Sequence, residues 1–207
     1  MAVAAGFVLS VMVYVARSGS DARLVRLRLT HGGLVEDPQV PPQVPDGQVT
    51  ILGVNGSLFF AGARTLAEQL PQARGSREAV VVLRLRGHEE IGATFITVLD
   101  VYADELEAGG GRLFLTGLTD PMSRQLRLSD KLDLEEAVHL RLAQPLLGAS
   151  TTQAHQEAHA WLRTRRDEPV EGQGHDLRRP QAPVLPEGAL RVSDRTGRAR
   201  NVRPPGA

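Results

Sequence analysis

Hydrophobic and polar positions in the middle of the chain repeat with two periods, which predict alternating strands and helices. Residues 79–85 are almost all β-branched or leucine, a pattern typical of a central strand covered on both faces. Shorter apolar runs predict further strands over residues 49–54, 57–60, 112–117 and 138–140. Helical spacing of apolar residues predicts helices over residues 61–70, 93–108, 121–128 and 150–165. This order of elements indicates an α/β fold.

Glycine and proline mark two of the predicted helix ends. The three glycines at 109–111 are expected to end helix 93–108, because glycine tolerates the left-handed conformation that a helix stop requires. Pro121 suits a first helical turn, and Asp120 before it is expected to cap that helix. Within helix 93–108 one apolar stripe is predicted to face the core, formed by Ile96, Leu99, Ala103 and Leu106.

The first sixteen residues are uncharged and mostly apolar, and arginines follow at positions 17, 23, 26 and 28. This run is shorter than the roughly 20 apolar residues of a complete membrane span. A secretory signal would begin with basic residues, which are missing here, and a buried soluble helix would be apolar on every side. Because basic residues mark the cytoplasmic side of a span, we expect residues 1–17 to be the C-terminal part of a transmembrane helix.

Three further segments are expected after this helix. Residues 18–48 are predicted to form a linker, with one short exposed strand within 24–29 and a proline-rich stretch after it. Residues 49–165 carry the periodic pattern of a folded domain. Residues 166–207 form a tail rich in proline and arginine, which lacks the apolar content for a core and is expected to be disordered.

Composition excludes several classes of function. The formal net charge is zero and aromatic residues make up 4% of the chain, which argues against a nucleic-acid partner. The chain has no cysteine, so disulfides, thiolate nucleophiles and cysteine-based zinc sites are excluded.

Candidate catalytic and metal-binding residues are few. His155 and His159 lie four apart on a predicted helix and could chelate a metal, but no third ligand is spaced nearby. The favoured interpretation is the polar surface of a terminal helix. His88 is followed by Glu89 and Glu90 in a predicted loop, where solvated side chains are the favoured interpretation. We therefore predict that the chain is not an enzyme and has no catalytic residue, cofactor or metal site.

Thr94 lies in the first turn of the helix that follows the central strand. Unpaired backbone N–H groups and the helix dipole favour negative charge there, so a phosphate on Thr94 would be accommodated. The alternative is that its hydroxyl caps the helix.

Residues 91–96 read Ile-Gly-Ala-Thr-Phe-Ile, and this segment resembles the Ile-Asp-Ala-Thr-Gly-Leu pattern of STAS domains. These domains occur in anti-sigma factor antagonists and in sulfate-permease (SulP) transporters. The motif positions are Ile91, Gly92, Ala93 and Thr94, and Thr94 matches the hydroxyl residue that is phosphorylated in the antagonists. Gly92 stands where aspartate is usual and Phe95 where glycine is usual. We therefore expect Thr94 to be a helix cap rather than a phospho-acceptor.

A second segment resembles the transporter members of the family. Residues 55–63 match their Gly-x-Leu-Phe-Phe-Ala-x-Ala pattern through Gly56, Leu58, Phe59, Phe60, Ala61 and Ala63. The order of apolar helix end, arginines, linker and domain is also that of SulP proteins after their last span. The resemblance implies a STAS-type fold, a small mixed β-sheet with helices packed against one face.

The resemblance to SulP proteins also implies a function. It predicts a cytoplasmic STAS regulatory domain of a bacterial transporter for sulfate or another inorganic anion, at the inner membrane. Its expected partners are the transmembrane transport domain of the same family, a second copy in a dimer, and the membrane through the N-terminal helix. No transport is expected from this chain alone. The alternative is a soluble module like the anti-sigma factor antagonists, switched by phosphorylation, which would have no use for an apolar N-terminus.

Overall fold

Six strands form one sheet in the order β2-β1-β3-β4-β5-β6. The computed structural model describes residues 22–37 and 39–167, together with Gly6 and Ser10. The strands are β1 (Arg23–Thr30), β2 (Gly33–Asp37), β3 (Val49–Asn55), β4 (Val80–Arg84), β5 (Arg112–Leu118) and β6 (Val138–Leu142). Strands β3 to β6 are parallel, whereas β1 is antiparallel to both of its neighbours. The predicted mixed sheet is confirmed.

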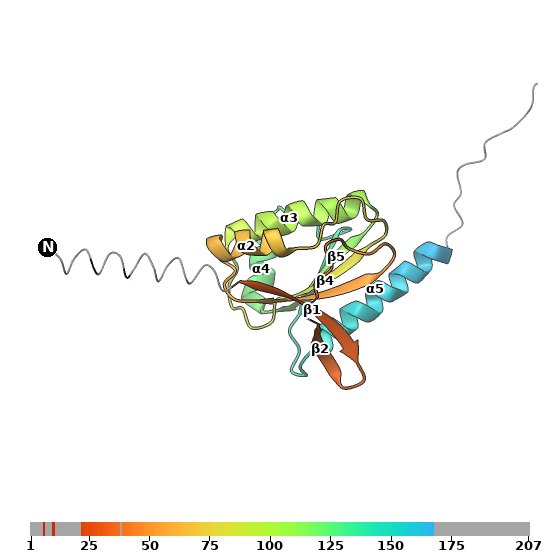
Figure 1. Cartoon of the computed structure of the whole chain (residues 1–207), viewed down its shortest axis with the longest axis horizontal. Helices are drawn as coiled ribbons and strands as arrows, with labels where there is room; N and C mark the ends of the chain where they lie inside the picture. The colour runs from red at the N-terminus through yellow and green to blue at the C-terminus, as the bar shows by residue number, and fades with distance from the viewer. Residues whose placement is uncertain (1–5, 7–9, 11–21, 38, 168–207) are drawn as a thin grey trace, which may run out of the picture. The chain divides into compact units, whose positions relative to one another are not determined.

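The helices cover both faces of the sheet. They are α2 (Phe60–Gln69), α3 (Ala93–Ala108), α4 (Asp120–Leu128) and α5 (Ala149–Asp167). Figure 1 shows α2 and α3 along one side of the sheet and α5 along the other. The expectation that the helices pack against one face is therefore wrong for α5. Its physical reason is that alternate residues of β4 are apolar on both faces, so each face needs a cover.

Two hydrophobic cores result. The larger lies beneath α2, α3 and α4, and the predicted stripe of α3 (Ile96, Leu99, Ala103 and Leu106) is buried in it. The smaller lies beneath α5 and contains Leu27, Ile51, Val80, Val82, Phe114, Ala154, Ala158 and Leu162. Residues 80–83 of β4 are fully buried, which confirms the prediction of a central strand.

Strand β1 belongs to the sheet rather than to a free linker. It pairs with β3 from Arg23 onward, and Leu24 and Leu27 are buried, so the expectation of an exposed strand is wrong. The side-chain amide of Gln69 on α2 holds the start of the strand. It accepts from the Leu24 N–H at 2.7 Å and donates to the Ala22 carbonyl at 3.2 Å.

Two local predictions are corrected by the structure. Residues 57–60 form no strand, because the chain turns at Gly56, whose φ is +93°, and α2 begins at Phe60. Thr119, not Asp120, caps α4, since the Thr119 hydroxyl accepts from the Met122 N–H and Asp120 is already helical. A capping side chain has to stand one residue before the helix.

The glycines at 109–111 end α3 as predicted. Gly110 has a φ of +72°, and the Gly111 N–H closes the helix end on the Leu106 carbonyl at 2.7 Å. The outer two are also needed for packing. A Cβ on Gly109 would collide with the Ser76 carbonyl, and one on Gly111 with that of Ala79.

Two predicted segments fall almost wholly outside the described residues. These are the membrane helix over 1–17, of which only Gly6 and Ser10 are described, and the tail over 166–207, of which only the first two residues are described. Among the helices within the described ranges, none combines the length and the apolar character needed to cross a membrane.

Candidate functional site

The two segments that resemble the family motifs meet at the carboxyl ends of β3 and β4. The N–H of Gly92 donates to the Leu58 carbonyl at 3.2 Å. A Cβ at position 92 would lie 3.1 Å from that carbonyl oxygen and 3.2 Å from the Cα of Phe59. An aspartate here would crowd the turn that leads into α2. Gly92 therefore allows a close approach of two segments that are far apart in the sequence.

Phe95, the other departure from the family pattern, is a core residue. Its side chain is 1% exposed and belongs to the cluster beneath α2 and α3. The start of α3 is therefore anchored by an aromatic ring.

Thr94 does not act as the expected helix cap. The N-cap of α3 is Gly92, no side chain caps this helix end, and Thr94 is the second helical residue. A capping hydroxyl would have to stand at position 92. Thr94 is half-buried and lines a groove over α2 and α3. Its role as a phospho-acceptor stays a hypothesis.

This groove has a volume of about 610 Å³ and is mostly apolar, lined by Ala67, Leu70, Ala93, Thr94, Thr97, Val98, Val101, Tyr102, Glu105 and Lys131. The Lys131 ammonium donates to the Thr97 hydroxyl at 2.8 Å, and Glu105 pairs with Arg74 at 3.3 Å. Burial, followed by the charge of Glu105, raises the pKa of Tyr102, whose hydroxyl donates to the Pro71 carbonyl at 3.0 Å. Each of these polar side chains already has a partner in the domain, so the groove offers a ligand mainly apolar contact.

A smaller hollow of about 410 Å³ lies beside the two motif segments. Its lining, called the motif edge from here on, consists of Ser57, Leu58, Phe59, Gly87, His88, Glu89 and Glu90. Nε2 of His88 lies 3.1 Å from the Val54 carbonyl, which fixes the imidazole against β3. Glu89 and Glu90 are exposed, as predicted, and Phe59 is 54% exposed. The motif edge therefore presents an aromatic ring beside two carboxylates.

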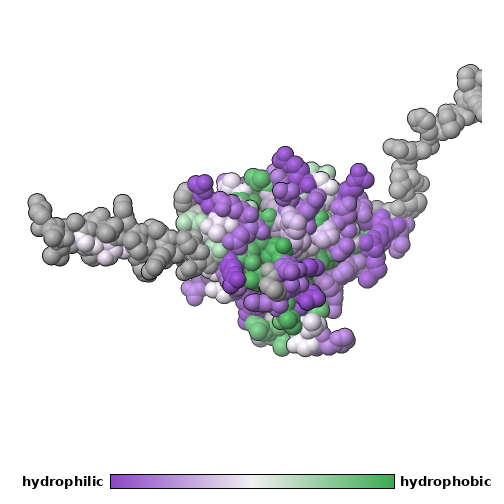
Figure 2. Space-filling view, viewed as in Figure 1, coloured by the Kyte–Doolittle hydropathy of each residue, from purple (hydrophilic) through white to green (hydrophobic). Residues whose placement is uncertain are grey.

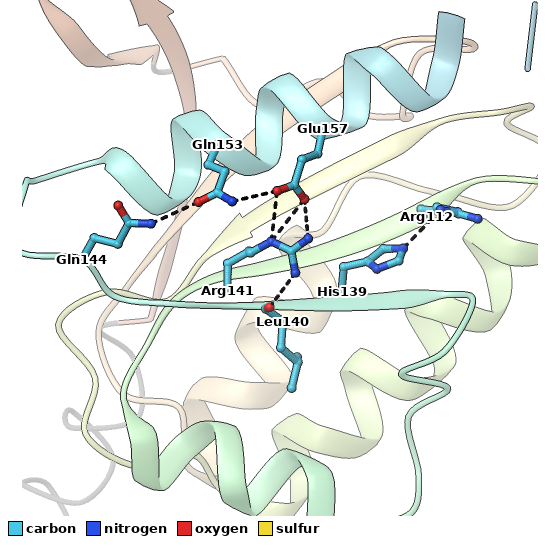
Figure 3. Close-up of polar contacts among 7 residues, drawn as sticks. All are labelled: Arg112, His139, Leu140, Arg141, Gln144, Gln153 and Glu157. Atoms are coloured by element: carbon cyan, nitrogen blue, oxygen red, sulfur yellow. Dashed lines mark hydrogen bonds and ion pairs between the residues drawn. The ribbon is translucent and has the colours of Figure 1, made fainter. Parts of the chain in front are cut away.

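A polar network between β6 and α5 was not predicted from the sequence (Figure 3). Arg141 on β6 forms an ion pair with Glu157 on α5. Gln153 donates to Glu157 at 2.9 Å and accepts from Gln144 at 3.1 Å. Although partial burial opposes it, hydrogen bonds from Arg141 and then Gln153 lower the pKa of Glu157. The network ties α5 to the edge strand of the sheet.

His139, next but one to Arg141 on β6, contacts the neighbouring strand β5. Its ring stacks on Phe114 with centroids 4.8 Å apart, and its Nε2 lies 3.3 Å from Nη1 of Arg112. Because an arginine only donates, Nε2 of His139 has to accept and is unprotonated. Burial first, then the charges of Arg112 and Arg141, lower the pKa of His139. The alternation of residues 138–141 could have indicated that positions 139 and 141 share a face.

Acidification is expected to lower the free energy of unfolding, in part through His139. Its folded pKa lies below the ordinary value of about 6.5, so the unfolded chain binds more protons. Stability present above about pH 6.5 is therefore lost as the pH falls to the folded pKa, and the lowered pKa of His155 acts in the same direction. Urea denaturation across this range measures the effect. His139→Gln should reduce the pH dependence, whereas a variant of the exposed His31 should keep it; equal slopes would contradict the prediction.

Three large apolar side chains of β2 and of the segment before α5 are exposed. Val35 on β2 is 50% exposed, and Leu146 and Leu147 before α5 are 74% and 73% exposed. The two segments adjoin, since a Cβ on Gly148 would lie 3.3 Å from the Leu34 side chain. Figure 2 shows hydrophobic residues at the end of the molecule where β2 lies, within a mixed surface.

Within the described residues, no three His, Asp or Glu side chains gather as a metal site.

Two solved structures of solute carrier 26 family member A9 contain a similar fold. The murine anion transporter in its inward-facing state matches with a TM-score of 0.54 and 15% identity, over 75% of this chain and 25% of that chain. The structure described as the overall structure of SLC26A9 matches with a TM-score of 0.51 and 14% identity, over 80% of this chain and 28% of that chain. The chain thus spans about a quarter of the length of these structures.

No curated protein matched the sequence. The family model of the STAS domain matches residues 40–144, half of the chain. This range contains both motif segments, strands β3 to β6 and helices α2 to α4. The resemblance to STAS domains is therefore confirmed, and the chain belongs to the STAS domain family.

Proposed function

We propose that this chain is the cytoplasmic regulatory STAS domain of a SulP-type anion transporter, and that it modulates transport by contact with the transmembrane domain. The observation that carries the proposal is the fold that three quarters of the chain shares with part of an anion transporter. The transporter-like segment 55–63 supports it, because in the folded domain this segment is packed against the second motif at Gly92.

The surface supports regulation through contact. Phe59 of the motif edge is 54% exposed, and Leu146 and Leu147 before α5 are 74% and 73% exposed. Contiguous exposed apolar residues commonly mark interaction sites. We assign the motif edge to the transport domain and the exposed pair Leu146 and Leu147 to a second copy in a dimer.

The start of the domain supports a mechanical link to the membrane. Residues 1–17 would anchor the chain in the plasma membrane, with the domain on the cytoplasmic side. The chain then enters the sheet at Ala22, which is 3% exposed and held by Gln69 of α2. A displacement of α2 would therefore move Ala22, close to the point where the chain leaves the membrane.

The substrate is proposed to be sulfate or a related inorganic anion.

Membrane association of the intact chain is the experiment that tests this assignment. We expect the intact chain, expressed in its host, to sediment with membranes and to be released by detergent but not by high salt. A matched chain that starts at Ala22 keeps all the strands and helices β1 to α5. A smaller fraction of it should sediment with membranes, and high salt should release that fraction. An intact chain that is freely soluble and monodisperse, with phosphate on Thr94, would instead support the antagonist-like module.

A further inference from the structure

Two histidines, His155 and His159, lie one turn apart on α5. Nε2 of His155 and Nε2 of His159 share a hydrogen bond of 3.2 Å, which a bound ion would replace, and their ring centroids are 4.4 Å apart at 74°. The helix beneath them is fixed, because Ala154, Ala158 and Leu162 are buried against the sheet. The two imidazoles therefore converge from a rigid backbone.

This separation fits chelation of one metal ion. Two imidazole nitrogens that are each about 2.0–2.1 Å from a tetrahedral ion lie roughly 3.3 Å from each other. Histidines at positions i and i+4 of a helix are a known arrangement for two ligands of one ion. The sequence favoured a polar helix surface here; from the separation of the two nitrogens we propose instead that His155 and His159 form a binding site for a divalent transition-metal ion of the class that favours imidazole, such as Ni²⁺, Zn²⁺ or Cu²⁺.

The surroundings of the pair are compatible with this role. Glu157, the nearest carboxylate in sequence, is held by Arg141 on β6 and is not available as a third ligand. Water would complete the coordination. The bound ion would link two successive turns in the middle of α5.

The probe is NiCl₂, titrated calorimetrically into the intact chain without a histidine tag. We expect one site per chain, and Ni²⁺ at a hundred times its Kd should raise the Tm by roughly 5–10 °C, reversed by EDTA. The exposed ligand is changed in His159→Gln, which should weaken binding at least about ten-fold, because even the loss of a group that only orients a ligand typically costs that much.

The matched control is His31→Gln, which changes another exposed histidine and should bind Ni²⁺ like the unaltered chain. A second ligand variant, His155→Gln, guards against a local effect of one substitution, and circular dichroism establishes that each variant is folded. The proposal is overturned if the unaltered chain does not bind Ni²⁺, or if folded variants at 155 and 159 bind it with unchanged affinity. This test does not depend on the proposed function.

Discussion

Truncation of Phe95 to alanine is expected to lower the free energy of unfolding by about 3–5 kcal/mol. The ring is 1% exposed and lies in the larger core, at the first turn of α3. Its loss removes buried apolar surface and leaves a cavity beneath the helix that carries the family motif. Urea denaturation followed by circular dichroism measures the change.

Phe59 offers a control of the same residue type. It stands at the N-cap of α2 and is 54% exposed, so Phe59→Ala should change the free energy of unfolding by only about 0.5 kcal/mol. Equal losses for the two variants would show that Phe95 does not carry the packing assigned to it.

Truncation of Leu99 to alanine is expected to cost about 2–5 kcal/mol of unfolding free energy. Leu99 is fully buried on the inner stripe of α3, one turn after Phe95. Val101 on the same helix is 55% exposed, so Val101→Ala is the matched control, with an expected change of about 0.5 kcal/mol. A loss for Leu99→Ala no larger than that of the control would mean that this helix face is not the core face.

Elements with a strong local signal were predicted from the sequence. Helix α3 was predicted with its observed bounds, because its apolar stripe is regular and glycines flank it on both sides. Strand β4 was predicted because its run of β-branched residues fits only a buried strand. In both cases local composition and tertiary environment agree.

The position of an element in the fold was not predicted correctly where contacts with distant residues decide it. The alternation in residues 24–29 indicated a strand, but pairing with β3 and the hydrogen bonds from Gln69 depend on residues far along the chain. The apolar run at 57–60 resembled a strand, yet the turn at Gly56 leads directly into α2. The place of α5 was missed because small residues, Ala154 and Ala158, form much of its buried face.

The candidate site was located by resemblance, but its physical logic required the structure. The sequence identified Gly92 and Phe95 as departures from the family pattern without explaining them. The structure gives each a reason, a close backbone approach at Gly92 and a core position at Phe95. The network of Arg141, Gln153 and Glu157 joins residues of β6 and α5 that no motif connects.

The most direct test of the proposed function is the initial rate of labelled sulfate uptake by host cells in which codons 40–144, the span of the STAS domain, are deleted. Transporter abundance in the membrane is measured in parallel, so that a change in rate reports regulation rather than expression. We predict that uptake of sulfate, or of another inorganic anion tested in the same way, falls several-fold and is restored by the intact gene. Unchanged uptake of every anion tested, at equal transporter abundance, would contradict a regulatory role in anion transport.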